Sequence, residues 1–161
     1  MAHGTNGGAS HRTGVNGWGF SRGEMPFRLR MWIPSTRTAI NGAVDEVCRL
    51  ADRCGCSEDL QADLEIALRE ALANAISHGN GLRAGRRVFL RCYGGPQAGI
   101  LLAVRDEGSG FEPADVPDPR SADRKHLSHG RGLLLMRELM DGLEYRRGGR
   151  EVVLFQQLRS S

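Results

Sequence analysis

EALANAISHGN, at residues 70–80, is the most informative segment of the chain. It closes a stretch whose apolar residues recur at helical spacing, and Glu70, Asn74 and His78 lie four residues apart in it. At about 100° per residue, these three side chains share one side of the helix. Glu70 and Asn74 fall on the flank of the apolar stripe, where a carboxylate and an amide cost free energy unless they are paired or bind something. A functional edge is one interpretation; the alternative, that Glu70 only solvates or caps a neighbouring loop, stays open at this point.

Two glycine-containing turns follow further along the chain. Asp106 directly follows a predicted strand and begins a turn that contains Gly108 and Gly110. Glycines let the backbone approach a flat or anionic ligand, and the Asp106 carboxylate can accept a hydrogen bond from an exocyclic amine. Gly130 and Gly132 precede a predicted helix, whose free N–H groups and positive dipole end favour phosphate. The turn after Asp106 could alone be an ordinary strand exit, and neither turn alone identifies a site. Their order after the helix edge indicates one shared site.

The hydrophobic pattern predicts eight elements and a long loop. Strands are expected over residues 27–33, 87–93 and 100–105, and near residues 143–147 and 150–158. Helices are expected after a cap at Ser35 or Thr36, after a cap at Ser57, and over residues 133–140. Residues 112–128 carry three prolines and no period, which predicts a lid. The order β-α-α-β-β-lid-α-β-β is typical of an α/β two-layer sandwich, and we expect one mixed sheet covered on one face by helices.

Composition bounds the class of protein. With 161 residues, of which 40% are hydrophobic and 25% charged, the chain suits one soluble domain and excludes a coiled coil or a two-domain enzyme. We expect a flexible, glycine-rich leader over residues 1–24 and a single domain over residues 25–161. The formal charge of +3, with both signs interspersed, is weak evidence for a nucleic-acid surface. No apolar run suits a membrane span or a secretory signal, so the expected location is cytoplasmic, without direct nucleic-acid or membrane contact.

The four cysteines, Cys48, Cys54, Cys56 and Cys92, do not form paired C-x-x-C motifs. A zinc site is conceivable at Cys54 and Cys56, but their spacing lacks the gap that lets two thiolates converge on one ion. We therefore expect small, partly buried hydrophobic side chains at a helix end and on a strand.

These segments together resemble those of a known superfamily. Residues 70–80 resemble the N-box of the GHKL ATPases, residues 106–111 their first glycine box and residues 129–133 their second, over a similarity that covers about residues 27–158. The His-Gly ending of the first segment and the run Leu139-Met140-Asp141 are similar to those of the small bacterial anti-sigma-factor serine/threonine kinases, which control stress and sporulation sigma factors by partner switching. The resemblance implies the GHKL (Bergerat-type) ATP-binding fold, with ATP and Mg²⁺ as cofactors.

The resemblance also implies roles for individual residues. Glu70 would be the catalytic residue that orients and deprotonates a serine hydroxyl, Asn74 would offer its side-chain oxygen to Mg²⁺, and Asp106 would bind adenine. Lid residues Arg120, Arg124 and Lys125 would neutralise the terminal phosphate. The nucleotide-binding positions implied besides these are His78, Gly108, Gly110, Phe111, Gly130, Arg131, Gly132 and Leu133.

One position departs from the family pattern, because Gly149 is followed by Arg150 where related chains usually carry a threonine that helps to fix adenine. Two functions therefore stay open. The first is a kinase that phosphorylates a small anti-anti-sigma-like antagonist and sequesters a sigma factor. The second is an ATP-sensing adaptor that binds a partner without phosphoryl transfer. The ATP-binding half of a histidine kinase, topoisomerase or mismatch-repair ATPase is less expected, since no phosphoacceptor helix is found before residue 27 and no transducer domain after residue 158. Homodimerisation is a further expectation from the resemblance.

Overall fold

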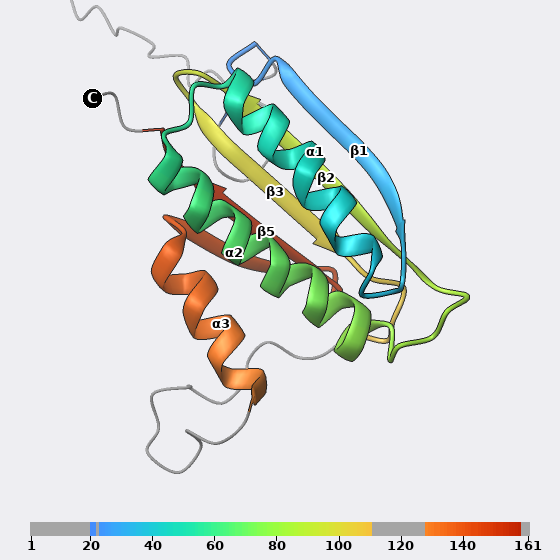
Figure 1. The fold of residues 1–161 in the computed structure, drawn as a ribbon. Helices are drawn as coiled ribbons and strands as arrows, with labels where there is room; N and C mark the ends of the chain where they lie inside the picture. The colour runs from blue at the N-terminus through green and yellow to red at the C-terminus, as the bar shows by residue number, and fades with distance from the viewer. Residues whose placement is uncertain (1–19, 22, 111–127, 159–161) are drawn as a thin grey trace, which may run out of the picture.

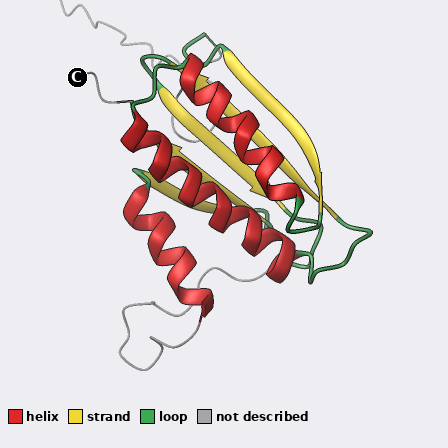
Figure 2. Cartoon of the chain, in the orientation of Figure 1, coloured by secondary structure: helices red, strands yellow, loops and turns green. Residues whose placement is uncertain are grey.

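The computed structural model describes residues 20–21, 23–110 and 128–158, which form two layers (Figure 1). The first layer is one sheet of the strands β1 (Phe27–Pro34), β2 (Arg87–Gly95), β3 (Gly99–Arg105), β4 (Gly142–Arg146) and β5 (Glu151–Gln156). The second layer holds the helices α1 (Ala39–Arg53), α2 (Glu58–Asn74) and α3 (Ser128–Leu139), and α2 continues into a π-helical turn, η1 (Ala75–Gly79). Figure 2 shows these helices together on one face of the sheet. The predicted α/β two-layer sandwich and its element order are therefore confirmed.

The strand directions correct one expectation. The sheet has the order β1-β2-β3-β5-β4, and all four neighbouring pairs are antiparallel, so the sheet is not mixed. The reason lies in the connections. Helices α1 and α2 run antiparallel to one another between β1 and β2 (Figure 1), so β2 begins beside the end of β1, where Pro34 pairs with Arg87. Short turns join β2 to β3 and β4 to β5, and such hairpins pair antiparallel.

The first two helices begin differently from one another. Ser57 caps α2 as predicted, since its Oγ accepts a hydrogen bond from the Leu60 N–H at 3.4 Å. The predicted cap of α1 at Ser35 or Thr36 is wrong, because α1 begins after Thr38. Ser35 is buried and its Oγ accepts a hydrogen bond from Asn80 Nδ2 at 3.2 Å, so its hydroxyl is engaged between elements.

The third helix begins earlier than its sequence indicates. It was expected from Leu133 but starts at Ser128, so Gly130 and Gly132 lie inside its first turns instead of before it. Glycine costs about 1 kcal/mol relative to alanine within a helix, which is why the sequence favours a later start. A contact from α2, described below, accounts for the glycine at position 132.

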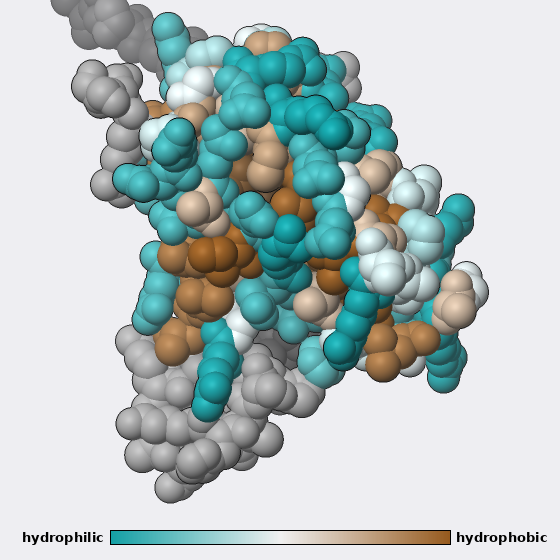
Figure 3. All heavy atoms as spheres, in the orientation of Figure 1, coloured by the Kyte–Doolittle hydropathy of each residue, from teal (hydrophilic) through white to brown (hydrophobic). Residues whose placement is uncertain are grey.

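The main core fills the space between the sheet and the helices. Leu68 and Leu72 of α2 and Leu90 and Leu102 of the central strands are fully buried there. Burying a leucine side chain contributes about 1.5–3 kcal/mol, so this contact holds the two layers together. Figure 3 shows hydrophilic residues over much of the outer surface of the helix layer, with hydrophobic residues visible between them.

A smaller cluster lies on the opposite face of the sheet. Met25 is 1% exposed and packs with Tyr93, Leu101 and Phe155, and the ring of Phe20 lies 5.1 Å from that of Phe155. Phe20, which lies inside the predicted leader, therefore contacts the sheet. The prediction for residues 1–19 lies outside the described residues.

The cysteines are part of the packing. Cys54, Cys56 and Cys92 are buried in the main core and Cys48 packs against it, as expected for small hydrophobic residues. Burial raises the pKa of the Cys54 thiol to about 11. In the part of the chain that the structure describes, no three His, Cys, Asp or Glu side chains are grouped to hold a metal ion. The described helices include none that is long and apolar enough to cross a membrane.

Candidate functional site: a cavity between α2, α3 and the sheet

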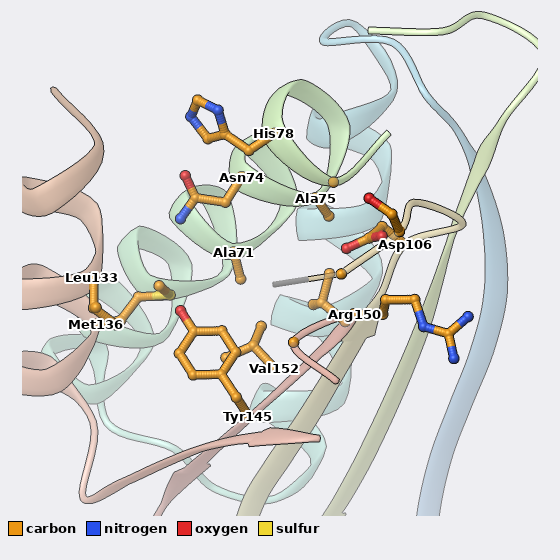
Figure 4. A pocket seen from close by; sticks show the side chains of 15 residues that line it. Ala71, Asn74, Ala75, His78, Asp106, Leu133, Met136, Tyr145, Arg150 and Val152 are labelled. Atoms are coloured by element: carbon orange, nitrogen blue, oxygen red, sulfur yellow. The ribbon is translucent and has the colours of Figure 1, made fainter. Parts of the chain in front are cut away.

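A cavity of about 310 Å³ opens between the C-terminal part of α2, the N-terminal part of α3 and the ends of β3, β4 and β5 (Figure 4). Its apolar walls are formed by Ala71, Ala75, Val104, Leu133, Met136 and Val152. Its polar groups are Asn74, His78, Asp106, Ser109, Tyr145 and Arg150. Apolar walls with a few convergent polar groups are the usual make-up of a small-molecule site. A second hollow, of about 490 Å³, lies at the other end of α2, and no predicted site residue lines it.

Asp106 lies at the cavity edge where β3 ends. Its backbone N–H donates to the carbonyl oxygen of Arg150 at 3.0 Å, which keeps the turn against β5. Its Oδ1 accepts a hydrogen bond from the Gly108 N–H at 2.7 Å. Burial raises the pKa of the Asp106 carboxyl above its ordinary value of 3.8, against the opposing influence of the Gly108 N–H and the Arg150 charge. The carboxylate is thus partly withdrawn from water, as a hydrogen-bond acceptor for a ligand must be.

The backbone around Asp106 passes so close to its neighbours that side chains do not fit. A Cβ at Gly79 would lie 2.3 Å from Asp106 Oδ2, and one at Gly108 would lie 1.9 Å from the Gly79 carbonyl oxygen. Gly110 has φ +79°, which favours glycine, and a Cβ there would lie 2.0 Å from the Gly148 carbonyl oxygen. The glycines of this turn therefore allow the backbone to pack closely against other parts of the chain, whereas the predicted approach of this backbone to a ligand stays a prediction.

The π-helical turn η1 links this turn to the end of α2. Asn80 ends the turn with its N–H bonded to the Ala75 carbonyl oxygen at 2.7 Å, and its side chain is fully buried. Asn80 Nδ2 donates to the carbonyl oxygen of Arg87 at 3.0 Å, and its Oδ1 accepts from the N–H of Glu107 at 2.8 Å. One amide therefore fixes the end of the helix, the start of β2 and the turn that carries Asp106. Such π turns are frequent at functional sites.

Glu70 and Asn74 face α3 together. A Cβ at Gly132 would lie 2.4 Å from Glu70 Oε2 and 3.6 Å from Asn74 Nδ2, so both side chains reach the position that a side chain at residue 132 would occupy. Asn74 lines the cavity, whereas Glu70 lies one turn earlier, beside the cavity lining. The structure therefore brings Glu70, Asn74 and Gly132 together across the contact between α2 and α3.

The predicted nucleotide-binding residues fall into three groups. Asn74, His78, Asp106, Gly110 and Leu133 line the cavity. Gly108, Gly130, Arg131 and Gly132 do not line it, although Gly108 supports Asp106, and the other three lie in the first turns of α3. Phe111, Lys125 and the rest of the predicted lid up to residue 127, including Arg120 and Arg124, lie outside the described residues.

Sequence reasoning missed two large side chains of the cavity. Tyr145 comes from β4, and Figure 4 shows its hydroxyl pointing into the cavity towards Met136 and Ala71. Burial raises the pKa of the Tyr145 hydroxyl above its ordinary value of 10. The alternation of Leu143 and Tyr145 on the helix-covered face was the available signal for Tyr145, and the helical spacing from Leu133 was the signal for Met136.

Arg150 contributes its aliphatic part to the cavity. Its Cγ would lie 3.0 Å from a Cβ at Gly110, and its Nε donates to the Arg147 carbonyl oxygen at 3.1 Å. Figure 4 shows the guanidinium directed away from Tyr145 and Met136. The charged end thus lies away from the part of the cavity that Tyr145 and Met136 line.

Comparison with known protein families agrees with this arrangement. The family described as the histidine kinase-like ATPase domain matches residues 33–156, a range that includes every residue of the cavity lining. The chain belongs to this family. The family is of the GHKL type, and membership implies that the domain binds ATP. A search of the curated proteins finds no match to the chain.

The side chains that line the cavity have the chemical character that a nucleotide site needs. The apolar walls of Ala71, Val104 and Met136 suit a flat ring, and the Asp106 carboxylate lies where an exocyclic amine can donate to it. Asn74 places an amide at the side of the cavity next to α3, and amide oxygen is among the ligands that Mg²⁺ accepts. The first turn of α3 lies on the same side, with the N–H groups that a helix start leaves for an anion.

Proposed function

We propose that the domain is an ATP-dependent serine/threonine protein kinase that acts as an anti-sigma regulatory factor in the cytoplasm. It would phosphorylate a small anti-anti-sigma-like antagonist and sequester a sigma factor by partner switching. The observation that carries the proposal is the contact at Gly132, where Glu70 and Asn74 converge beside a cavity of about 310 Å³. The His-Gly ending of residues 70–80 and the run Leu139-Met140-Asp141 resemble those of the anti-sigma kinases, and this resemblance supports the choice of substrate.

Each residue of the site has a role in the proposed reaction. Asp106 accepts a hydrogen bond from the adenine amine, Asn74 offers its side-chain oxygen to Mg²⁺, and the backbone of residues 130–132 contacts the phosphates. Glu70 accepts the proton of the serine hydroxyl as the serine oxygen bonds to the terminal phosphorus and the bond to the leaving ADP breaks. Mg²⁺ supplies positive charge to the phosphates when it is bound. Positioning and charge stabilisation account for most of the catalysis of phosphoryl transfer, so this set is sufficient.

The test measures the transfer of labelled phosphate from ATP, in the presence of Mg²⁺, to a candidate antagonist whose gene lies next to the gene of this protein. Glu70→Gln should lower the rate of transfer about 100-fold or more and leave nucleotide affinity within about two-fold, because only the proton acceptor is lost. Glu65→Gln is the matched control, since Glu65 lies on the same helix and pairs with Arg69 at 2.8 Å. Transfer at the unchanged rate in Glu70→Gln would remove Glu70 as the base.

The non-catalytic adaptor is the second candidate, and Arg150 favours it. The guanidinium cannot make the compact hydroxyl contact that a threonine makes with the adenine site. Calorimetry that shows tight binding of nucleotide, together with no transfer to any candidate antagonist, would favour the adaptor over the kinase.

A further inference from the structure

The face of the sheet opposite the helices carries a row of stacked rings and guanidinium groups. Trp32 of β1 pairs in register with Phe89 of β2, and their ring centroids are 4.6 Å apart. The guanidinium carbon of Arg87 lies 4.4 Å from the Trp32 ring centroid, and that of Arg105 lies 5.3 Å from the Phe89 ring centroid. Trp32 is 44% exposed although it is one of the largest hydrophobic residues of the chain. An exposed tryptophan flanked by arginines is typical of the centre of a binding surface.

The part of this face on β1, β2 and β3 carries positive charge only, whereas Glu151 of β5 lies on the same face beside it. We call six residues the arginine-aromatic face: Arg30, Trp32, Arg87, Phe89, Arg91 and Arg105. On the three strands that carry it, the positions that point away from the helices include no Asp or Glu. The nearest glutamates come from other segments: the buried Glu151 pairs with Arg91 at 2.5 Å, and Glu107 lies 3.8 Å from Arg87.

We propose that the arginine-aromatic face is a docking surface for an acidic segment of a partner protein. The surface lies on the opposite side of the sheet from the cavity, so the inference goes beyond the proposed function and does not depend on phosphoryl transfer. Stacking against the rings restricts the guanidinium groups of Arg87 and Arg105, so less entropy is lost when their N–H edges donate to carboxylates. The exposed part of Trp32 supplies the apolar anchor that such a segment needs.

Two other occupants fit the face less well. A second copy of the chain related by two-fold symmetry would place arginines opposite arginines, which opposes association. Single-stranded nucleic acid binds by stacking its bases on open aromatic faces. Here each ring already has the other ring and a guanidinium against it, so a base would have to displace a guanidinium in order to stack.

The test measures the affinity of the full chain for a fluorescein-labelled peptide in which glutamates alternate with leucines, by fluorescence anisotropy at low salt. We expect binding that weakens as salt is added and that is lost when glutamine replaces every glutamate in the peptide. Trp32→Ala and Arg105→Gln should each weaken binding about ten-fold, which is the range for a hydrogen bond to a charged group or for a buried aromatic contact. Arg49→Gln, on exposed α1 surface of the opposite layer, should stay within about two-fold of the wild type.

Three outcomes would overturn the proposal. The first is equal affinity for the glutamate and glutamine peptides, or no effect of Trp32→Ala and Arg105→Gln. The second is tighter binding of an oligo-thymidine strand than of the acidic peptide, with the same variants impaired, which would assign the face to nucleic acid. The third is a dimer in light scattering that Trp32→Ala dissociates, which would assign the face to a second copy. The nucleotide-induced thermal shift, measured on each variant, shows that its fold and its cavity are intact.

Discussion

Asp106 is a residue whose burial favours ligand binding at the expense of the stability of the free protein. Its carboxyl is partly buried beside Gly79, and its pKa is raised above 3.8 because burial disfavours the charged form. The folded state therefore holds the proton more tightly than the unfolded state does. Below the pKa that Asp106 has in the unfolded chain, the carboxyl is protonated in both states and its burial does not lower the free energy of unfolding. As the pH rises through the folded pKa, the carboxyl is ionised in both states and its desolvation lowers the free energy of unfolding.

Asp106→Asn should accordingly have opposite effects on stability and binding. We expect a higher free energy of unfolding than in the wild type at neutral pH, because the amide carries no charge to desolvate and its oxygen can still accept from the Gly108 N–H. The difference should disappear as the pH falls to the unfolded pKa of aspartate. Nucleotide affinity should drop about ten-fold or more, since the charged acceptor for the adenine amine is lost. Urea unfolding across pH and calorimetry with ATP measure the two effects, and an unchanged stability at neutral pH would contradict the account.

At the scale of the element, Gly132 leaves room beside α3 for the Glu70 side chain of α2. Gly132→Ala should increase or preserve stability, because alanine is favoured over glycine within a helix by about 1 kcal/mol and the nearest atom is the mobile end of Glu70. The new Cβ would nevertheless displace the Glu70 carboxylate. We therefore expect phosphoryl transfer to fall about ten-fold or more while unfolding by urea occurs at the same or higher concentration.

Gly42→Ala is the matched control for that experiment. Gly42 lies within α1, and nothing lies within 4 Å of the Cβ it would gain. The same propensity gain of about 1 kcal/mol should appear there without any change in transfer. If Gly132→Ala kept full transfer activity, the position of Glu70 next to α3 would not matter to the reaction.

The elements show what the sequence could predict and why the rest escaped it. The start of α2 was predictable because Ser57 acts on the N–H of Leu60 only three residues away. The start of α3 was not, because the glycine at 132 reflects contact with Glu70, which is distant in sequence. The sheet was expected to be mixed for the same reason, since the direction of β1 relative to β2 depends on how α1 and α2 lie between them.

The site residues likewise differ in whether local sequence could predict them. Asn74 and Asp106 could be predicted as members of one site because each belongs to a local motif with its own chemistry. Tyr145 reaches the cavity from β4, whose place at the sheet edge is set by its pairing with β5. The buried amide of Asn80 connects Ser35, Arg87 and Glu107, and no spacing in the sequence indicates that these three meet.

On the scale of the whole molecule, the sheet separates two surfaces. The cavity lies on the side of the helices, whereas Phe20 and Met25 pack on the other side, against Phe155 and Leu101. A Cβ at Gly95 would lie 1.8 Å from the carbonyl oxygen of Glu24, so the segment before β1 lies directly on the sheet. A substitution that weakens the packing of Phe20 and Met25 should therefore lower the free energy of unfolding without changing nucleotide binding on the helix side of the sheet.

Met25→Ala tests that separation. Met25 is 1% exposed, and truncating a buried methionine to alanine costs about 2–5 kcal/mol, through lost burial and the void left behind. Urea unfolding should show this loss, whereas the affinity for ATP, measured by calorimetry at a temperature where the variant is fully folded, should stay within about two-fold of the wild type. Leu82→Ala, at a side chain that is 57% exposed, should change stability by no more than about 0.5 kcal/mol. A fall in ATP affinity that parallels the loss of stability would mean that the two faces of the sheet are coupled, because the strands that Met25 covers also carry Val104 and Asp106 to the cavity.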